Sequence, residues 1–230
     1  MKKISILAAI VVIVAGGVLF LSQYFLEPTE AFGQSGRKVL MIPREGYSTD
    51  LDLMIKMEVG VMTILLKGAG FEVDIATTSG QPILGPTQKI EKVMRLSEVN
   101  VDNYVGVIMP CMAVGMHPGP PVSPQTVMLV KRALADGKPV AAAANAGIIL
   151  AEAGVLKGKK YAFITDPLKT TETIKRTDPR FEGAIYSGPG VVQDGKIITS
   201  GVCPNLEKVY AMQNGTVELT QKFIAAISPK

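Results

Sequence analysis

Short apolar runs alternate along the chain with longer segments in which apolar residues recur at helical spacing. The apolar runs that predict buried strands are 38–43, 72–76, 105–110, 139–143 and 161–165. The segments that predict helices are 50–67, 124–135, 145–153 and 206–227. This alternation predicts an α/β fold with a mostly parallel central sheet and helices on both faces, of the flavodoxin-like kind.

Turn residues and capping residues mark the boundaries of several of these elements. Ser123 followed by Pro124 is typical of an N-cap and a first helical residue. Asp194 and Gly195 lie between two apolar runs and predict the turn of a hairpin. The strand that ends at 143 leads into the next helix with almost no loop, which is the geometry of a nucleophile elbow.

The N-terminal segment has a different pattern, with Lys2 and Lys3 followed by the uncharged run 4–21. At about 1.5 Å per residue this run would form a helix of about 27 Å, close to the roughly 30 Å hydrocarbon thickness of a bilayer. We therefore predict a signal anchor or transmembrane helix within residues 1–26. A turn-rich linker over 27–36 and a single domain over 37–230 complete the predicted organisation.

The charge of the N-terminal flank predicts where the domain lies. Lys2 and Lys3 keep the N-terminus in the cytoplasm, so the domain is expected to be extracytoplasmic and anchored to the membrane. The alternative is cleavage near Gly33, because Ala31 and Gly33 are small residues at the positions that a signal peptidase reads. Cleavage would release a secreted or periplasmic chain that begins at Gln34.

Charge and motif spacing argue against several kinds of ligand. The net charge is +4, but the chain has no long Lys/Arg run and few aromatic residues, so binding to nucleic acid is not expected. The Gly-Pro loops do not match the dinucleotide or P-loop fingerprints. No Cys/His spacing fits a metal site. We predict neither a cofactor nor a metal.

One segment resembles a known protein family. GKPVAAAANAGIILAEAGVLKGKK (137–160) resembles the elbow segment of the ThiJ/PfpI family, which usually reads G-K-P-V-A-A-I-C-H-G, then an apolar helix, then A-G-V-L-x-G. Other stretches that fall in family order are KVLMIP (38–43), GAGFEVDIATTSG (68–80), VGVIMPC (105–111) and DGKIITSG (194–201). The resemblance covers nearly all of residues 37–228 and implies the class I glutamine-amidotransferase-like fold.

The departures from this family pattern bear on function. Ala144 and Asn145 stand where the family has its cysteine and histidine, and alanine has no nucleophilic atom. The family's P-G-G loop reads Pro110, Cys111 and Met112 in this chain. The resemblance therefore implies that the elbow is kept while its nucleophile is lost.

The resemblance also implies roles for residues around the elbow. Glu45 is the preferred match to the acid that hydrogen-bonds the family's cysteine, and Glu58 in the following helix competes for that role. Cys111 is either a relocated nucleophile at the end of a central strand or a small buried hydrophobe. His117 is either its partner or a surface residue of a Pro/Gly-rich loop. Cys203 is expected at the same rim, where a disulfide with Cys111 would form.

Three functions stay open at this point. In the first, the domain is non-catalytic and binds a small molecule or a partner in the former catalytic pocket. By resemblance this pocket is formed by Glu45, Pro110, Cys111, Met112, Ala144, Asn145 and Cys203. In the second, it is a hydrolase or redox enzyme of altered chemistry that uses Cys111 with Glu45 or His117. In the third, it is a structural element at the membrane surface. The resemblance also implies a homodimer.

Overall fold

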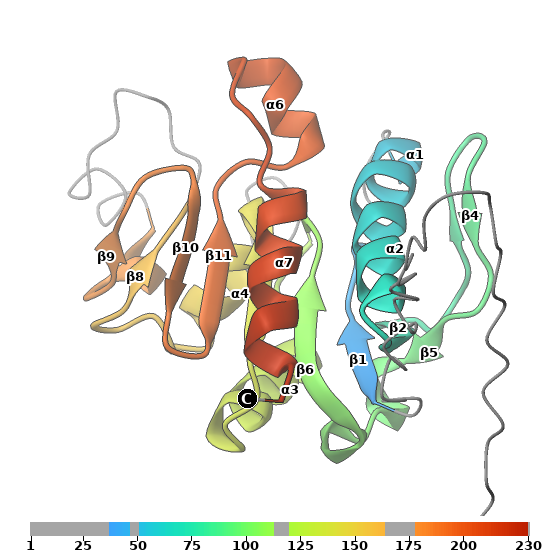
Figure 1. Ribbon diagram of the computed structural model, residues 1–230, viewed down its shortest axis with the longest axis horizontal. Coiled ribbons are helices and arrows are strands. Elements are labelled where there is room, and N and C mark those ends of the chain that lie inside the picture. The colour runs from blue at the N-terminus through green and yellow to red at the C-terminus, as the bar shows by residue number, and fades with distance from the viewer. Residues whose placement is uncertain (1–36, 47–50, 113–119, 164–177, 230) are drawn as a thin grey trace, which may run out of the picture. The chain divides into compact units, whose positions relative to one another are not determined.

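The computed structural model describes residues 37–46, 51–112, 120–163 and 178–229 (Figure 1). Seven strands form one sheet in the order β10-β11-β7-β6-β1-β2-β5. They are β1 (Lys38–Met41), β2 (Glu72–Thr77), β5 (Met94–Arg95), β6 (Tyr104–Met109), β7 (Val140–Ala143), β10 (Val191–Asp194) and β11 (Ile197–Ser200). All neighbours in this sheet pair in parallel except β10 and β11, which form the predicted hairpin. The mostly parallel α/β fold is confirmed.

Two short sheets stand apart from the central one. β3 (Ile83–Leu84) pairs with β4 (Lys89–Ile90), and β8 (Lys160–Tyr161) pairs with β9 (Ile185–Tyr186). The prediction of a strand over 161–165 is therefore wrong in its bounds for the described part of that range. Beyond β8 the backbone turns to other partners, because the N–H of Ala162 donates to the Thr199 hydroxyl and that of Phe163 donates to the Gly188 carbonyl.

The helices cover both faces of the central sheet (Figure 1). They are α1 (Leu51–Met54), α2 (Val61–Gly68), α3 (Pro124–Ala135), α4 (Gly147–Glu152), α6 (Pro204–Tyr210) and α7 (Thr216–Ile227), with a π-helical segment η1 (Ile55–Gly60) and 3-10 turns η2 (Leu96–Glu98), η3 (Val101–Asn103), η4 (Ala144–Ala146) and η5 (Pro179–Phe181). The single helix predicted over 206–227 is two helices, since Ala211 adopts the left-handed conformation and ends α6. Because α1, η1 and α2 follow without a break, the helix predicted over 50–67 is present with a π turn in its middle.

Alternating residues of the strands supply two hydrophobic layers, one on each face of the sheet. In β6, Val107 and Met109 pack with α3 and α4, while Ile108 packs with α2 and α7. This is the two-residue period of a strand that is buried on both sides. Gly106 in β6 lets α7 approach closely, because a Cβ there would lie 2.8 Å from the Phe223 ring.

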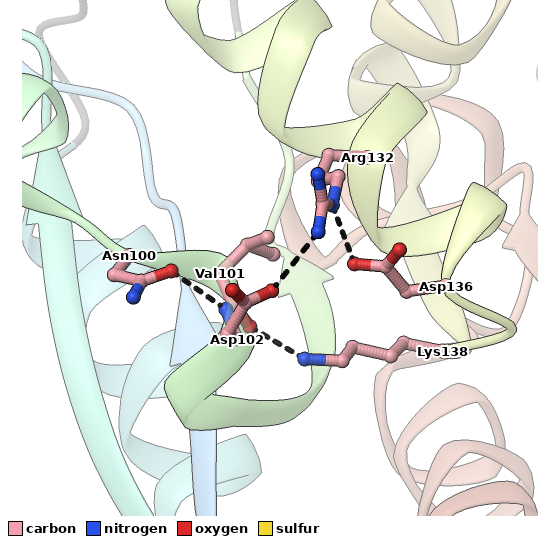
Figure 2. Close-up of polar contacts among 6 residues, drawn as sticks. All are labelled: Asn100, Val101, Asp102, Arg132, Asp136 and Lys138. Carbon is pink, nitrogen blue, oxygen red and sulfur yellow. Dashed lines mark hydrogen bonds and ion pairs between the residues drawn. The ribbon is translucent and has the colours of Figure 1, made fainter.

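Polar contacts fix the direction of α3 relative to β6 (Figure 2). Arg132, near the end of α3, donates to Asp136 at 2.7 Å and to Asp102 at 3.5 Å. Lys138 donates to the Val101 carbonyl at 2.7 Å, in the turn that precedes β6. The C-terminal end of α3 therefore lies beside the start of β6. Its N-terminal end lies toward the carboxyl edge of the sheet.

The predicted anchor over 1–26 and the linker over 27–36 lie outside the residues that the structure describes. Among the described residues, no helix combines the length and the apolar character needed to cross a bilayer.

Candidate functional site

The predicted elbow is the turn between β7 and α4, at the carboxyl edge of the sheet. β7 ends at Ala143 and passes directly into η4, whose first residue is Ala144. Ala144 is fully buried and has φ of 46°. For a residue other than glycine this left-handed conformation costs roughly 1–2 kcal/mol. The chain therefore maintains a strained turn at a residue whose side chain is a single methyl group.

Two thiols lie against this turn. Cys111 follows β6 and Cys203 follows β11, the two strands that flank β7, and with Ala144 they form one buried cluster. The Cys111 thiol donates a hydrogen bond to the Cys203 sulfur. The prediction that they are neighbours is confirmed. In place of the predicted disulfide, the structure has two free thiols held together by this hydrogen bond.

The two thiols differ in acidity because they take opposite roles in that hydrogen bond. The bond from Cys111, the N–H groups of Leu206 and Asn205 and the charge of Arg44 together lower the pKa of Cys203 to about 7. Donation to Cys203, burial and the charge of Glu58 raise the pKa of Cys111 above its usual value. A thiolate in this pair therefore forms on Cys203, which the sequence did not favour as the reactive residue.

A buried carboxyl group completes the cluster. Glu58 lies on the π turn η1, is 3% exposed, and accepts a hydrogen bond from the Cys111 N–H at 3.0 Å. Burial, together with the charge of Cys203, raises its pKa to about 8, although the hydrogen bond from Cys111 and the charge of Arg44 lower it. Glu58 is therefore mostly protonated near neutral pH.

The preferred acid, Glu45, has different partners. Its carboxylate accepts hydrogen bonds from the Ser79 N–H, at 3.1 Å for each oxygen, and from the Ser79 hydroxyl. The structure thus brings Glu58 to the thiols and Glu45 to the end of β2. Arg44, which the sequence reasoning did not single out, is buried and acts electrostatically on both Glu58 and Cys203. The one signal for it was a charge immediately after an apolar strand.

A cavity of about 460 Å³ opens beside the cluster. Its wall is formed by residues that follow β1, by the end of β2, by Met112 after β6, by residues just before α3, by the first turn of α3 and by one residue of α4. Its lining residues include Ile42, Arg44, Glu45, Met112, Val122, Ser123, Thr126 and Ile149. Ligands of open α/β sheets bind at this carboxyl edge.

The predicted pocket residues divide between these two places. Cys111, Ala144 and Cys203 form the buried cluster, and the Asn145 N–H donates to the Cys111 sulfur. Glu45 and Met112 line the cavity. Pro110 is buried at the end of β6.

Two further site predictions concern His117 and metal binding. His117 falls in 113–119, outside the described residues. Within the described ranges, no three His, Cys, Asp or Glu side chains gather as they would around a metal ion.

Comparisons with known proteins place these features in a family. Residues 37–210 match the model of the DJ-1/PfpI family. An uncharacterized protein of Methanocaldococcus jannaschii is 30% identical over 179 residues, which cover 76% of this chain and 80% of that protein. A protein named as a deglycase, from Thermococcus kodakarensis, is 30% identical over 165 residues, or 71% of this chain and 89% of that protein.

Solved structures share the fold. A ThiJ/PfpI domain protein from Brachyspira murdochii superposes with a TM-score of 0.60 at 14% identity, over 85% of this chain and 98% of that one. Drosophila melanogaster DJ-1beta superposes with a TM-score of 0.58 at 22% identity, over 85% and 92% of the two chains.

Proposed function

The chain belongs to the DJ-1/PfpI family, and from this premise we propose that its domain binds a small molecule at the carboxyl edge of the sheet without nucleophilic chemistry at the elbow. The observation that carries the proposal is Ala144, a buried residue with a left-handed backbone at the turn between β7 and α4. The resemblance of segment 137–160 to the family's elbow assigns the missing cysteine to this position. A methyl group supplies no electron pair for attack.

The cavity beside the elbow supports binding. Small-molecule sites in proteins are usually clefts of about 300–1,000 Å³, mostly apolar and with a few polar groups that fix orientation. The cavity of about 460 Å³ fits that description, with Ile42, Met112 and Ile149 as apolar wall and Arg44 and Thr126 as polar wall.

A fragment screen tests the binding proposal. We expect fragments to shift the methyl resonance of Met112, and Val122→Phe, which narrows the cavity, to weaken their binding at least about tenfold. Val99→Phe is the matched control, because Val99 packs against the same core layer and does not line this cavity. If no fragment perturbs Met112, or if both variants behave alike, the cavity is not a binding site.

Replacement of Ala144 by cysteine tests the elbow assignment. At a true elbow the new thiol would ionise at lower pH than an ordinary cysteine and would react with a thiol probe accordingly. A new thiol no more reactive than an ordinary exposed cysteine would show that this turn is not the family's nucleophile position.

One observation favours a second candidate, a hydrolase or redox enzyme of altered chemistry. The hydrogen-bonded pair Cys111 and Cys203, with the lowered pKa of Cys203, has the components of a reactive dithiol, and one relative carries the name of a deglycase. Cys203 is 1% exposed, which restricts attack on a large substrate. If the protein has hydrolase or redox activity and Cys203→Ser abolishes it, this candidate would be favoured over pure binding.

The place of the domain in the cell is part of the proposal. Residues 1–26 would hold it outside the cytoplasmic membrane, or cleavage near Gly33 would release it there. Reporter fusions after Gly36 should be active only in the exported compartment, and activity confined to the cytoplasm would contradict this. The homodimer that the resemblance implies stays a prediction.

A further inference from the structure

We infer that the cavity takes a small molecule with a carboxylate group joined to an apolar body, an inference that rests on the proposed binding function and names the class of its ligand. The cavity is lined by a charged residue, Arg44, by the first turn of α3, and by the apolar residues Ile42, Met112 and Ile149.

Arg44 supplies the positive charge. It follows β1, is 6% exposed and lines the cavity. A guanidinium group stays protonated in proteins and presents a planar fork of donors that matches both oxygens of a carboxylate. A buried cation of this kind favours an anion over a neutral ligand in the same space.

The first turn of α3 adds a second feature of the same sign. Ser123 caps this helix, and residues 123–126 line the cavity. The N-terminus of a helix carries a partial positive charge and backbone donors, which together favour anions. At the other end of α3, Arg132 and Lys138 contact Asp136, Asp102 and the Val101 carbonyl at the start of β6 (Figure 2), so the N-terminus of α3 lies toward the carboxyl edge of the sheet.

Thr126 provides an independent sign that a ligand group is expected there. It lines the cavity and is 1% exposed, and its hydroxyl has no hydrogen-bond partner within the described residues. A buried hydroxyl without a partner costs free energy, and a ligand oxygen in the cavity would remove that cost. Glu45, the acidic residue of the wall, accepts hydrogen bonds from Ser79, and its charge would repel a ligand carboxylate, which would therefore bind near Arg44 and α3.

Pairs of probes that differ only in charge test the inference. Phenylacetate and hexanoate are titrated against phenylacetamide and hexanamide into the full-length protein labelled on methionine methyl groups, in nanodiscs where a membrane is needed. Met112 reports the cavity, and the half-exposed Met57 on η1 is the internal control. We expect each carboxylate to bind at least about tenfold more tightly than its amide, and inorganic phosphate to bind more weakly than either carboxylate.

Thr126→Val gives the sharpest variant, because it removes the hydroxyl and keeps the shape of the side chain. We expect carboxylate affinity to fall about three- to tenfold with no loss of thermal stability, since the hydroxyl has no partner to lose. Thr216→Val is the matched control, a buried residue in the first turn of α7 whose hydroxyl is likewise without a partner in the described residues. It should leave affinity unchanged.

The outcomes separate this inference from the proposed function. The inference that the ligand carries a carboxylate would be overturned if the amides or phosphate bind as tightly as the carboxylates, or if Thr126→Val and Thr216→Val have equal affinities. The proposal that the cavity binds a small molecule would still stand. Failure of these probes and of the fragment screen at Met112 would overturn both. Arg44→Gln should also weaken carboxylate binding, but Arg44 acts on Glu58 and Cys203 as well, so Thr126→Val decides.

Discussion

Two adjoining regions of the carboxyl edge have complementary properties. The thiol cluster of Cys111, Ala144, Cys203 and Glu58 has ionisable groups with shifted pKa values but is almost closed to solvent. The cavity has room for a ligand but no thiol in its wall. In this domain, therefore, the ionisable groups and the space for a ligand lie next to each other, whereas in an active site they coincide.

Arg44 belongs to both regions. It lines the cavity, and its charge lowers the pKa of both Glu58 and Cys203. A change of charge in either region should therefore alter the electrostatics of the other region through Arg44.

The largest expected effect is the pH dependence of the free energy of unfolding that Glu58 causes. Its carboxyl ionises near pH 4.5 in the unfolded chain and near pH 8 in the folded domain. Between these values the unfolded state binds fewer protons than the folded state. The contribution of Glu58 to the free energy of unfolding is therefore complete below pH 4.5 and is lost as the pH rises toward 8. At about 1.4 kcal/mol per pH unit, wild type should lose about 2.5 kcal/mol between pH 5 and pH 7 relative to Glu58→Gln.

Urea denaturation at a series of pH values measures this difference. The measurements stop at pH 7 because Cys203 affects stability in the opposite direction above that pH. Its contribution to the free energy of unfolding is complete above pH 9 and is lost as the pH falls through about 7. Glu218→Gln, at an exposed position of α7, should keep the wild-type profile. Parallel profiles for wild type and Glu58→Gln would show that the buried carboxyl is not held protonated.

The next effect concerns the thiol pair. Cys111→Ala removes the hydrogen bond that contributes most to lowering the pKa of Cys203, so this pKa should rise from about 7 toward its usual value of 9.0. Thiolate absorbance near 240 nm, followed as a function of pH, reports the shift. Cys203→Ala is the companion variant, and its remaining thiol should ionise only at high pH. An unchanged pKa of Cys203 in Cys111→Ala would mean that the two thiols do not interact.

A smaller effect is expected at the elbow itself. Ala144→Gly should raise the free energy of unfolding by about 0.5–1 kcal/mol, because relief of the left-handed strain exceeds the entropy cost of glycine. Ala142→Gly in β7 makes the same change where the backbone is extended, and it should lower stability by roughly 1 kcal/mol. Equal losses in the two variants, measured by thermal denaturation, would contradict strain at Ala144.

The smallest effect is the link through Arg44. A carboxylate bound beside Arg44 would offset part of its charge, so phenylacetate should raise the pKa of Cys203 by less than about one unit. By reciprocity, phenylacetate should bind more tightly at pH 6 than at pH 8. Titration of the thiolate with and without phenylacetate measures the pKa of Cys203, and binding titrations at pH 6 and pH 8 measure the difference in affinity. No change in either would place the ligand away from Arg44.

The parts of this molecule that the sequence predicted are those set by local pattern. Buried strands read as continuous apolar runs, so the parallel sheet could be predicted, and the short connection after Ala143 indicated the elbow. The nearness of Cys111 and Cys203 followed from the family register. These inferences need only the order of elements along the chain.

The parts that it did not predict depend on where single side chains point. The choice between Glu45 and Glu58 depends on the π turn at 55–60, which apolar spacing does not reveal. The burial of Arg44 is a tertiary effect, since a charge after a strand is usually solvated. The break at Ala211 was missed because a left-handed alanine has no sequence signal of the kind that glycine gives.

The position of α7 determines when the chain can finish folding as it is synthesised. Leu219, Phe223 and Ile227 pack against residues of β6, β7 and β11 in the middle of the sheet, where Gly106 leaves room for them. Without α7, the central strands expose one apolar face. A nascent chain in which α7 has not yet been synthesised should therefore be prone to aggregation through this face.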